Sequence, residues 1–296
     1  MLGKFMGISL TLAFAAISAS AANNAPVRSN LSAADIVNKN VQARGGLQAW
    51  RAVQSLSMEG KLGAGGNQRA PLPLPVPGSK SGKLPAPPRL KEEAQLPFEM
   101  DVQRPRKTRF QIQFNGKTAV QVFDGTNGWK FRPYLNRLDV EPFTPDELKA
   151  SSMQPELDGP LVDYAAKGTR IELEGTEKVE DRDAYKLKLI QKNGRTFHVW
   201  IDAQNYLEAK VEGLPRRLDG VEHPVEVYYR DYRAVNGLQI PFVLETKVLP
   251  APKKASGIRE TPIPTEKIVI QNVVVNPKLD ASLFQKPQPT AALAHN

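Results

Sequence analysis

Apolar and polar residues alternate with a period of two over most of this chain, and this pattern constrains the fold more than any other feature. From Gln54 onward about eleven short runs show it, ending with residues 267–275. The alternation is clearest over 98–102, 110–112, 185–189, 197–201, 207–211, 225–229 and 240–244. A strand with one apolar and one charged face is typical of an antiparallel sheet that is wet on one side. We therefore expect a mainly β protein built on one large antiparallel sheet.

Asn-Gly pairs predict where the strands turn and how neighbouring strands align. At Asn193-Gly194 a three-residue loop places Leu189 opposite Phe197 and keeps the apolar side chains of both strands on one face. At residues 236–237 a two-residue loop is favoured, because it pairs Tyr229 with Leu244. A slip of one residue exchanges the two faces of a strand, so burial of the apolar face selects each loop.

The pair at residues 115–116 is interpreted by the same rule. A three-residue loop over 114–116 places Val120 and Val122 on the face that carries Phe110 and Ile112. The sequence therefore predicts that the apolar surface continues across these two strands.

A few helical pieces accompany the strands. Ser32 as N-cap and Asp35 in the first turn, near the positive end of the helix dipole, predict a helix over 32–44, with a short second turn that carries Trp50. Thr144 followed by Pro145 is a capped helix start. Two further short pieces are predicted over 158–164 and 280–284.

The segment 70–97 holds eight prolines in 28 positions. Proline cannot donate to a strand ladder, and the segment has few apolar anchors. We expect a long flexible loop here, inserted between the first and second strands of a single domain.

The N-terminus has the layout of a secretory signal. Lys4 precedes an apolar stretch over residues 5–17, which ends in the small residues Ala19-Ser20-Ala21. This predicts a signal peptide over 1–21, cleaved after Ala21, because the apolar run is shorter than the ~20 residues that span a membrane. We expect residues 22–296 to be a soluble domain exported to the periplasm; a retained N-terminal anchor is the alternative.

Composition argues against several classes of function. The chain has no cysteine, which excludes disulfides, thiolate metal sites and cysteine nucleophiles, and it has three histidines. His198 and His223 have no partner at metal-ligand spacing, and we predict no cofactor and no catalytic residue. The formal charge of +9 is spread over the strands, so we expect no nucleic-acid partner; an anionic membrane surface or a merely soluble basic surface are the remaining interpretations.

The large sheet predicts a cavity. About eleven strands would span roughly 50 Å if flat, so twist must curl them into an open barrel or half-barrel. The few helical pieces cover its mouth but do not fill it, so an apolar concavity remains for an acyl chain or a similar ligand. A fully collapsed core is the alternative. The candidate ligand-binding residues are Phe98, Met100, Phe110, Ile112, Val120, Val122, Trp129, Phe131, Leu187, Leu189, Phe197, Val199, Val227, Phe242 and Leu244.

Several short segments, in order along residues 43–284, carry a resemblance to a known family. They are 45–50 (GGLQAW), 117–129 (KTAVQVFDGTNGW), 158–164 (DGPLVDY), 184–187 (AYKL), 206–210 (YLEAK) and 231–237 (DYRAVNG). Together they resemble the outer-membrane lipoprotein-sorting proteins of the LolA/LolB type. The resemblance implies an unclosed antiparallel β-barrel whose helices form a lid over an apolar cavity. It also implies a role in carrying lipoprotein acyl chains across the periplasm, with inner- or outer-membrane transport proteins as partners.

These expectations combine into a leading hypothesis and two alternatives. The leading one is a periplasmic, non-enzymatic carrier that binds lipoprotein acyl chains or lipids by area burial alone. The first alternative is an envelope-stress sensor or scaffold that uses the same fold to contact a membrane protein partner. The second is an esterase or glycosidase, which would depend on one of the paired carboxylates.

Overall fold

The computed structural model describes residues 31–65, 93–133, 138–154, 156–218, 220–251 and 263–288. Its helices are α1 (Ala33–Ala43), α2 (Leu47–Ala52), α3 (Pro145–Ser152) and the 3-10 turn η2 (Ala281–Phe284). Its strands are β1 (Ser55–Gly65), β2 (Glu93–Gln103), β3 (Lys107–Phe114), β4 (Lys117–Phe123), β5 (Gly128–Phe131), β6 (Val140–Pro142), β7 (Arg170–Val179), β8 (Arg182–Ile190), β9 (Thr196–Asp202), β10 (Glu208–Glu212), β11 (Arg216–Leu218), β12 (Val221–His223), β13 (Val225–Val235), β14 (Leu238–Val248) and β15 (Glu266–Val275).

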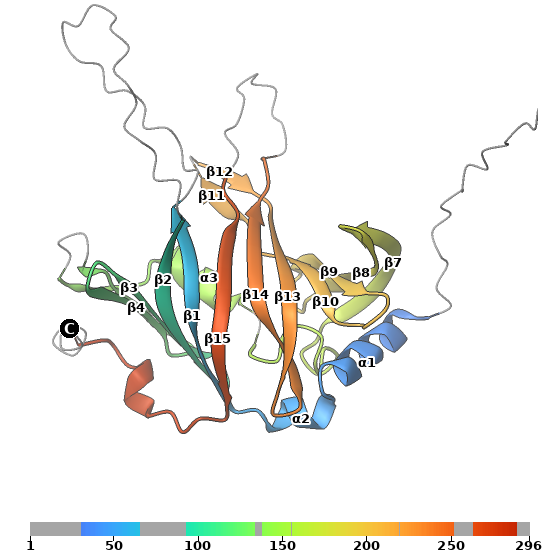
Figure 1. The fold of residues 1–296 in the computed structure, drawn as a ribbon, viewed down its shortest axis with the longest axis horizontal. Coiled ribbons are helices and arrows are strands. Elements are labelled where there is room, and N and C mark those ends of the chain that lie inside the picture. The colour runs from blue at the N-terminus through green and yellow to red at the C-terminus, as the bar shows by residue number, and fades with distance from the viewer. Residues whose placement is uncertain are drawn as a thin grey trace, which may run out of the picture.

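One antiparallel sheet of thirteen strands forms the molecule, in the order β6-β5-β4-β3-β2-β1-β15-β14-β13-β10-β9-β8-β7 (Figure 1). The edge strands β6 and β7 do not pair with each other, so the barrel is unclosed, as predicted. The expected number of strands, about eleven, is wrong, because β5, β6 and the separate β11–β12 ribbon have only three or four residues each. Runs that short show no clear alternation.

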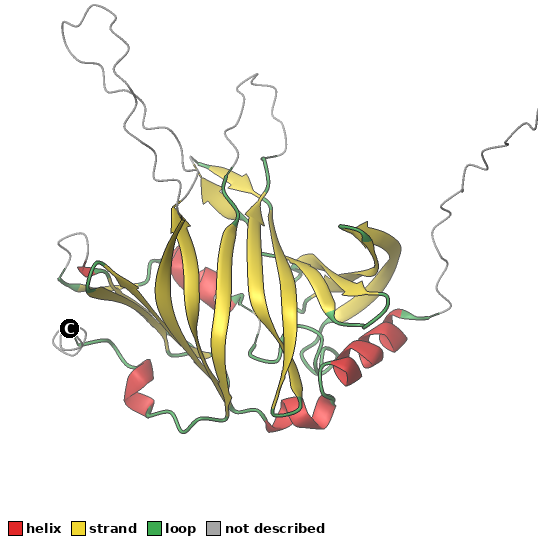
Figure 2. Ribbon diagram, in the orientation of Figure 1, coloured by secondary structure: helices red, strands yellow, loops and turns green. Residues whose placement is uncertain are grey.

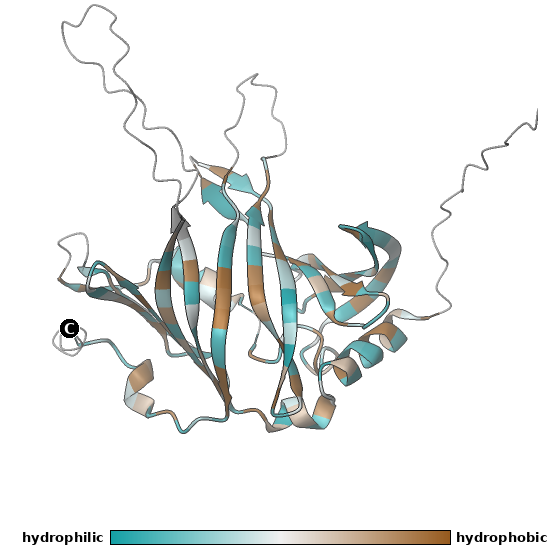
Figure 3. Ribbon diagram, in the orientation of Figure 1, coloured by the Kyte–Doolittle hydropathy of each residue, from teal (hydrophilic) through white to brown (hydrophobic). Residues whose placement is uncertain are grey.

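Two of the three predicted registers are confirmed. Leu189 lies opposite Phe197 across the 192–194 loop, and Tyr229 lies opposite Leu244 across the 236–237 turn. The alternation that selected these registers is visible as changing colours along β14 and β15 in Figure 3. Burial of one face therefore fixes the alignment at both hairpins.

The predicted register between β3 and β4 is wrong. Phe114 pairs with Lys117 across a two-residue turn in which Asn115 and Gly116 both have positive φ, as a type I′ hairpin requires. Val120 then lies opposite Gln111, and Val122 opposite Arg109, on the outer face of the sheet rather than on the face of Phe110.

The predicted helices form where a cap is present. Ser32 caps α1 through a reciprocal bond with Asp35, and Thr144 caps α3 in the same way. The predicted turn over 280–284 is confirmed as η2. The predicted helix over 158–164 is wrong: this segment consists of successive turns, with Asp163 at a φ of 52°.

The predicted loop over 70–97 ends too late, because β2 already begins at Glu93 and Pro97 pairs with Lys61 of β1. The other residues of that prediction, and the predicted signal peptide over 1–21, lie outside the described residues.

The helices α1 and α2 lie together at one end of the sheet, which we call the α2 end, and α3 lies apart from them (Figure 2). A close approach of backbones fixes α2 there. Gly45 adopts a φ of 113°, and a Cβ at this position would lie 2.4 Å from the carbonyl oxygen of Gly237. The Arg44 carbonyl in turn accepts a hydrogen bond from Gln239 N at 3.0 Å. The α1–α2 link is therefore docked on the β13–β14 hairpin.

Burial of the inner face varies along the strands, and at the far end of β13 and β14 the paired Val225 and Val248 are buried again. On β14, Leu238, Ile240 and Phe242 are buried beneath the helices, whereas Leu244, farther from the α2 end, is half-buried. The strands beside it show the same change, from Ile270 to Ile268 on β15. The helices thus roof the α2 end of the concavity more completely than the opposite end.

A charge cluster connects the helices at the α2 end to the sheet. It consists of Arg44, Arg104, Asp158, Lys167 and Glu208. Arg44 Nη1 donates to the Asp158 carbonyl at 2.9 Å and lies 3.2 Å from Glu208 Oε1. The Asp158 carboxylate accepts from Arg104 at 2.8 Å and from Lys167 at 2.6 Å. Arg44, Asp158 and Glu208 are all buried. Buried charges that bind one another in this way force the end of α1, the turns after residue 157 and β10 to assemble together.

Asp158→Asn tests the charge cluster. We expect the free energy of unfolding to fall by about 3–5 kcal/mol, because Arg104 and Lys167 lose a buried counter-charge. Denaturant unfolding followed by circular dichroism measures it. The matched control is Asp163→Asn in the same segment, whose exposed ion pair with Arg51 is screened by water and contributes little. Equal effects of the two variants would contradict a special role for the cluster.

The different burial of Phe242 and Leu244 on β14 predicts that truncating them lowers the free energy of unfolding by different amounts. Phe242→Ala, at 5% exposure, should lower the free energy of unfolding by about 3–5 kcal/mol through loss of burial and a cavity. Leu244→Ala should lower it by about 1 kcal/mol, because that side chain is already partly in water. Denaturant unfolding of both variants tests this prediction. If Leu244→Ala lowers the free energy of unfolding as much as Phe242→Ala does, the concavity is fully filled.

Candidate ligand-binding concavity

A row of half-buried apolar side chains crosses the inner face at the end away from α2. Hydrogen-bonded strands bring its five members into line: Tyr229 pairs with Leu244, Leu244 with Ile268, Ile268 with Leu62, and Leu62 with Leu96. None of the five is fully buried. We call them the apolar row. It is the part of the inner face that the helices cover least.

Eleven of the fifteen predicted lining residues lie on this inner face. Six of them are buried in the core: Phe98, Leu187, Leu189, Phe197, Val199 and Phe242. Five are half-buried: Met100, Phe110, Ile112, Val227 and Leu244. The half-buried residues offer most of the surface that a ligand could reach in the conformation observed, and of the buried ones Phe197 also lines a pocket, so the accessible part of the predicted lining is smaller than the alternation alone suggested.

The other four, Val120, Val122, Trp129 and Phe131, lie on the outer face and are a correction. Val120 pairs with Phe131, and Val122 pairs with Trp129. They form a separate cluster capped by Phe284 of η2, which is 1% exposed. Their apolar character is explained by this second core and not by the concavity.

A pocket of about 340 Å³ opens beside the apolar row, which is within the range of small-molecule sites. Its apolar floor comes from adjacent strands and consists of Phe197, Val211, Val227 and Tyr229. Its rim is formed by the residues that end and follow α3, by Gly159 and Pro160, and by the β8–β9 turn. Apolar surface at the base and polar groups at the mouth make it suited to an amphiphilic ligand.

The electrostatics at the floor keep the phenol of Tyr229 neutral. Burial raises its pKa to about 12, and the negative charge of Glu208 adds to this shift while Arg44 opposes it. Its hydroxyl has no hydrogen-bond partner among the described residues. A neutral donor therefore faces the pocket among apolar groups, where it can orient a polar atom of a bound molecule.

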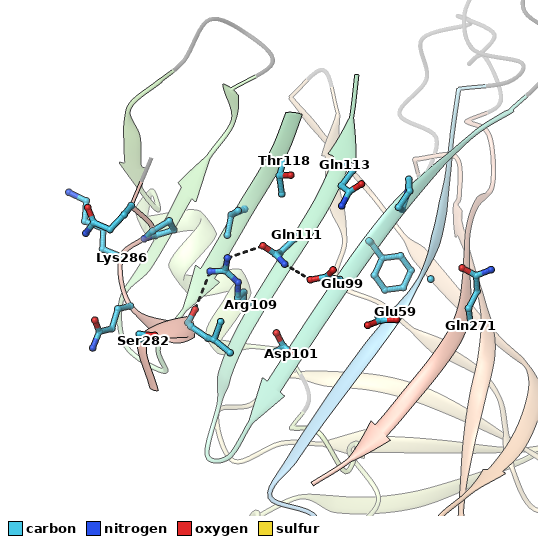
Figure 4. A pocket seen from close by; sticks show the side chains of 18 residues that line it. Glu59, Glu99, Asp101, Arg109, Gln111, Gln113, Thr118, Gln271, Ser282 and Lys286 are labelled. Carbon is cyan, nitrogen blue, oxygen red and sulfur yellow. Dashed lines mark hydrogen bonds between the residues drawn. The ribbon is translucent and has the colours of Figure 1, made fainter. Parts of the chain in front are cut away.

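A larger hollow of about 740 Å³ lies on the outer face of β1–β4, beneath the segment that follows η2 (Figure 4). Its lining is polar: Arg109 donates to Gln111 at 2.8 Å, and Gln111 donates to Glu99 at 2.5 Å. Arg109 also donates to the Leu283 carbonyl at 3.3 Å, which ties the C-terminal segment to the sheet. Burial lowers the pKa of Arg109, and the charges of Asp101 and Glu99 oppose this shift. An acyl chain would strip water from these charged groups, so the smaller inner pocket is the better apolar site.

The two histidines that the structure describes have local partners. His198 lies on the outer face between Glu174 and Glu212, at 3.1 and 2.8 Å. His223 donates to the Leu249 carbonyl at 3.0 Å. Within the described residues, no group of three or more His, Asp or Glu side chains is placed to hold a metal ion.

Sequence reasoning missed Tyr229, Ile268, Leu62 and Leu96 as members of the concavity. Tyr229 was assigned to the inner face through its pairing with Leu244, and Ile268 lies in the last predicted strand, so the signal for both was present. Leu96 lies inside the segment 70–97 that was predicted to be a loop, Leu62 precedes that segment, and the alternation around both is interrupted by Gly60, Gly63 and Pro97.

Comparison with known proteins supports the fold. No family model matches this chain, and no curated protein sequence matches it. A LolA superfamily protein from Nitrosomonas europaea superposes with a TM-score of 0.50 at 11% identity, over 86% of this chain and 98% of its own. A DUF1329 family protein from Desulfovibrio piger gives 0.50 at 12% identity, over 88% and 99%. An outer membrane lipoprotein-sorting protein domain from Vibrio parahaemolyticus gives 0.49 at 13% identity, over 85% and 95%. The two structures at a TM-score of 0.50 show that the chain has an unclosed-barrel fold like that of a LolA superfamily protein, as the resemblance in its sequence implied.

Proposed function

We propose that this protein is a periplasmic, non-enzymatic carrier that binds lipoprotein acyl chains or other lipids in its concavity. The single observation that carries the proposal is the apolar row beside the inner pocket, which stays half-buried on the inner face of the sheet. A chain laid on this row would gain about 0.8 kcal/mol for each methylene removed from water. Binding needs no covalent step and no cofactor.

The helix α3 is the element best suited to move when a ligand enters. It contributes no buried side chain, whereas α1 buries Ile36, Val37, Asn40 and Val41. Polar contacts hold it instead: Lys130 binds Glu147 at 2.5 Å, and Arg106 donates to the Ser152 carbonyl at 2.7 Å. The Arg106 contact is exposed and exchanges with water, whereas Lys130 is buried, so its pair with Glu147 must open if α3 is to shift while α1 and α2 stay docked.

Support for a periplasmic site comes from the sequence and from the fold. Residues 1–21 have the layout of a cleaved signal, and proteins of the same fold include one described as lipoprotein-sorting at the outer membrane. Among the described residues, none of the helices has the length and apolar character needed to cross a membrane.

Lipid carriage is tested by expressing the full chain in an envelope-containing host and examining the purified protein by native mass spectrometry. We expect a bound lipid, and saturable binding of an apolar fluorescent probe once that lipid is removed. The double variant Leu244→Asn with Ile268→Asn should lose at least about tenfold in probe affinity, since two polar amides then interrupt the apolar row.

The matched control replaces two exposed apolar residues away from the row, Val221→Asn and Val274→Asn, at 48% and 44% exposure. It should bind the probe like the wild type. Absence of both co-purified lipid and saturable probe binding in the wild type would refute the carrier function.

Export predicts a defined N-terminus. The protein recovered from the periplasmic fraction should begin at Ala22, since the small residues before it fit the signal-peptidase pattern. Intact-mass measurement gives this directly. A Lys4→Glu variant should reach the periplasm less efficiently, because it reverses the charge of the n-region. Recovery of an uncleaved chain in the membrane fraction would instead favour a retained anchor.

A further inference from the structure

The mouth of the inner pocket carries more positive than negative charge. Four cationic side chains line it, Arg106, Lys167, Lys192 and Arg195, against two carboxylates, Glu156 and Glu212. All six come from the rim, around the apolar floor described above.

Both carboxylates are already engaged. Glu156 lies 3.2 Å from Arg106, 3.6 Å from Arg104 and 3.9 Å from Lys167. Glu212 accepts from the backbone N–H of His198 at 2.9 Å and binds its ring at 2.8 Å, on the outer face of the sheet. Neither carboxylate is left to neutralise the remaining two cations.

Lys192, which is exposed, and Arg195 therefore have no carboxylate in ion-pair contact. Among the described residues, no carboxylate lies within 4.0 Å of either side chain. Arg195 is half-buried over the ring of Phe197, at 4.7 Å from its centre, and donates to the Met153 carbonyl at 3.3 Å. Burial lowers the pKa of this guanidinium, an effect that the charge of Glu212 opposes only in part. A half-buried cation without a counter-ion costs free energy that a bound anion would recover.

We propose that the ligand of this pocket is a lipid with an anionic, phosphate-type headgroup, held between Lys192 and Arg195 with its acyl chains on the apolar row. This inference rests on the proposed carrier function and names its substrate class. The planar fork of Arg195 matches two oxygens of a phosphate, and Lys192 adds a point charge beside it. The floor residues Val227 and Tyr229 lead from this mouth to the row, since Tyr229 is itself its first member.

The test compares two lipids with identical acyl chains, phosphatidylglycerol and uncharged diacylglycerol, by their ability to displace an apolar fluorescent probe from the full chain. We expect phosphatidylglycerol to displace the probe at about tenfold lower concentration. The double variant Lys192→Gln with Arg195→Gln should bring the two lipids to equal potency. Circular dichroism and the thermal midpoint check that the variant is folded.

A matched control removes the same charge elsewhere: Lys178→Gln with Lys267→Gln, two exposed lysines outside the pocket, should keep the preference. Loss of the preference in this control would mean that net charge and not the pocket mouth selects the lipid, and would overturn the proposal. Equal potency of the two lipids on the wild type would overturn it as well, while leaving lipid carriage intact.

Inorganic phosphate distinguishes a lipid headgroup from a free anion. The preference should persist in 10 mM phosphate, about the concentration of an ordinary buffer. If phosphate alone removes it, the cations bind the free ion and the headgroup assignment is wrong. If neither lipid displaces the probe, the carrier function itself fails, and that result is distinct from the others.

Discussion

The buried guanidinium of Arg44 is the interaction on which the arrangement of roof and sheet depends. It lies 4.3 Å from the ring of Trp50, 3.2 Å from Glu208 and 2.9 Å from the carbonyl oxygen of Asp158. A charge buried in this way is tolerated only when every partner is in place, because an uncompensated one costs several kcal/mol. The partners come from α2, from β10 and from the turns after residue 157. Placing Arg44 thus fixes α1 and α2 over one end of the concavity.

Local sequence patterns predicted the strands well and their alignment in part, and the β3–β4 hairpin shows why. Both of its strands carry apolar side chains, but Phe110 packs on the inner core while Val122 packs under Phe284, which is more than 150 positions away. The alternation of apolar and polar residues indicates that one face of a strand is buried. It does not indicate whether the inner core or a second cluster on the outer face buries it. At Asn193-Gly194 the same reasoning succeeded because the side chains that set the register, Leu189 and Phe197, pack into the same core.

The segment 158–164 shows a different limit. Its composition suggested a short helix, yet Gly159 and Asp163 adopt positive φ and the chain forms consecutive turns. The turn conformation lets the Asp158 carboxylate reach Arg104 and Lys167 and its carbonyl reach Arg44. A long-range charge cluster here overrides a weak local preference. For the site, the sequence predicted the inner-face residues of the central strands, but it gave no sign that Lys192 and Arg195 would meet at one rim, since that depends on where α3 ends.

The two ends of the concavity have different roles: the α2 end stabilises the fold, and the opposite end is the proposed binding site. At the α2 end, buried aromatic and aliphatic side chains and the charge cluster hold the helices, and their burial stabilises the fold. At the other end the inner face keeps apolar surface partly in water, which is a cost in the free protein. This exposed apolar surface makes ligand binding favourable, because a bound acyl chain would remove the apolar row from water. Polar contacts suit the attachment of α3, because an apolar contact would compete with the acyl chain for the same surface. The half-open end is thus the physical condition for a domain of this fold to carry a lipid and release it.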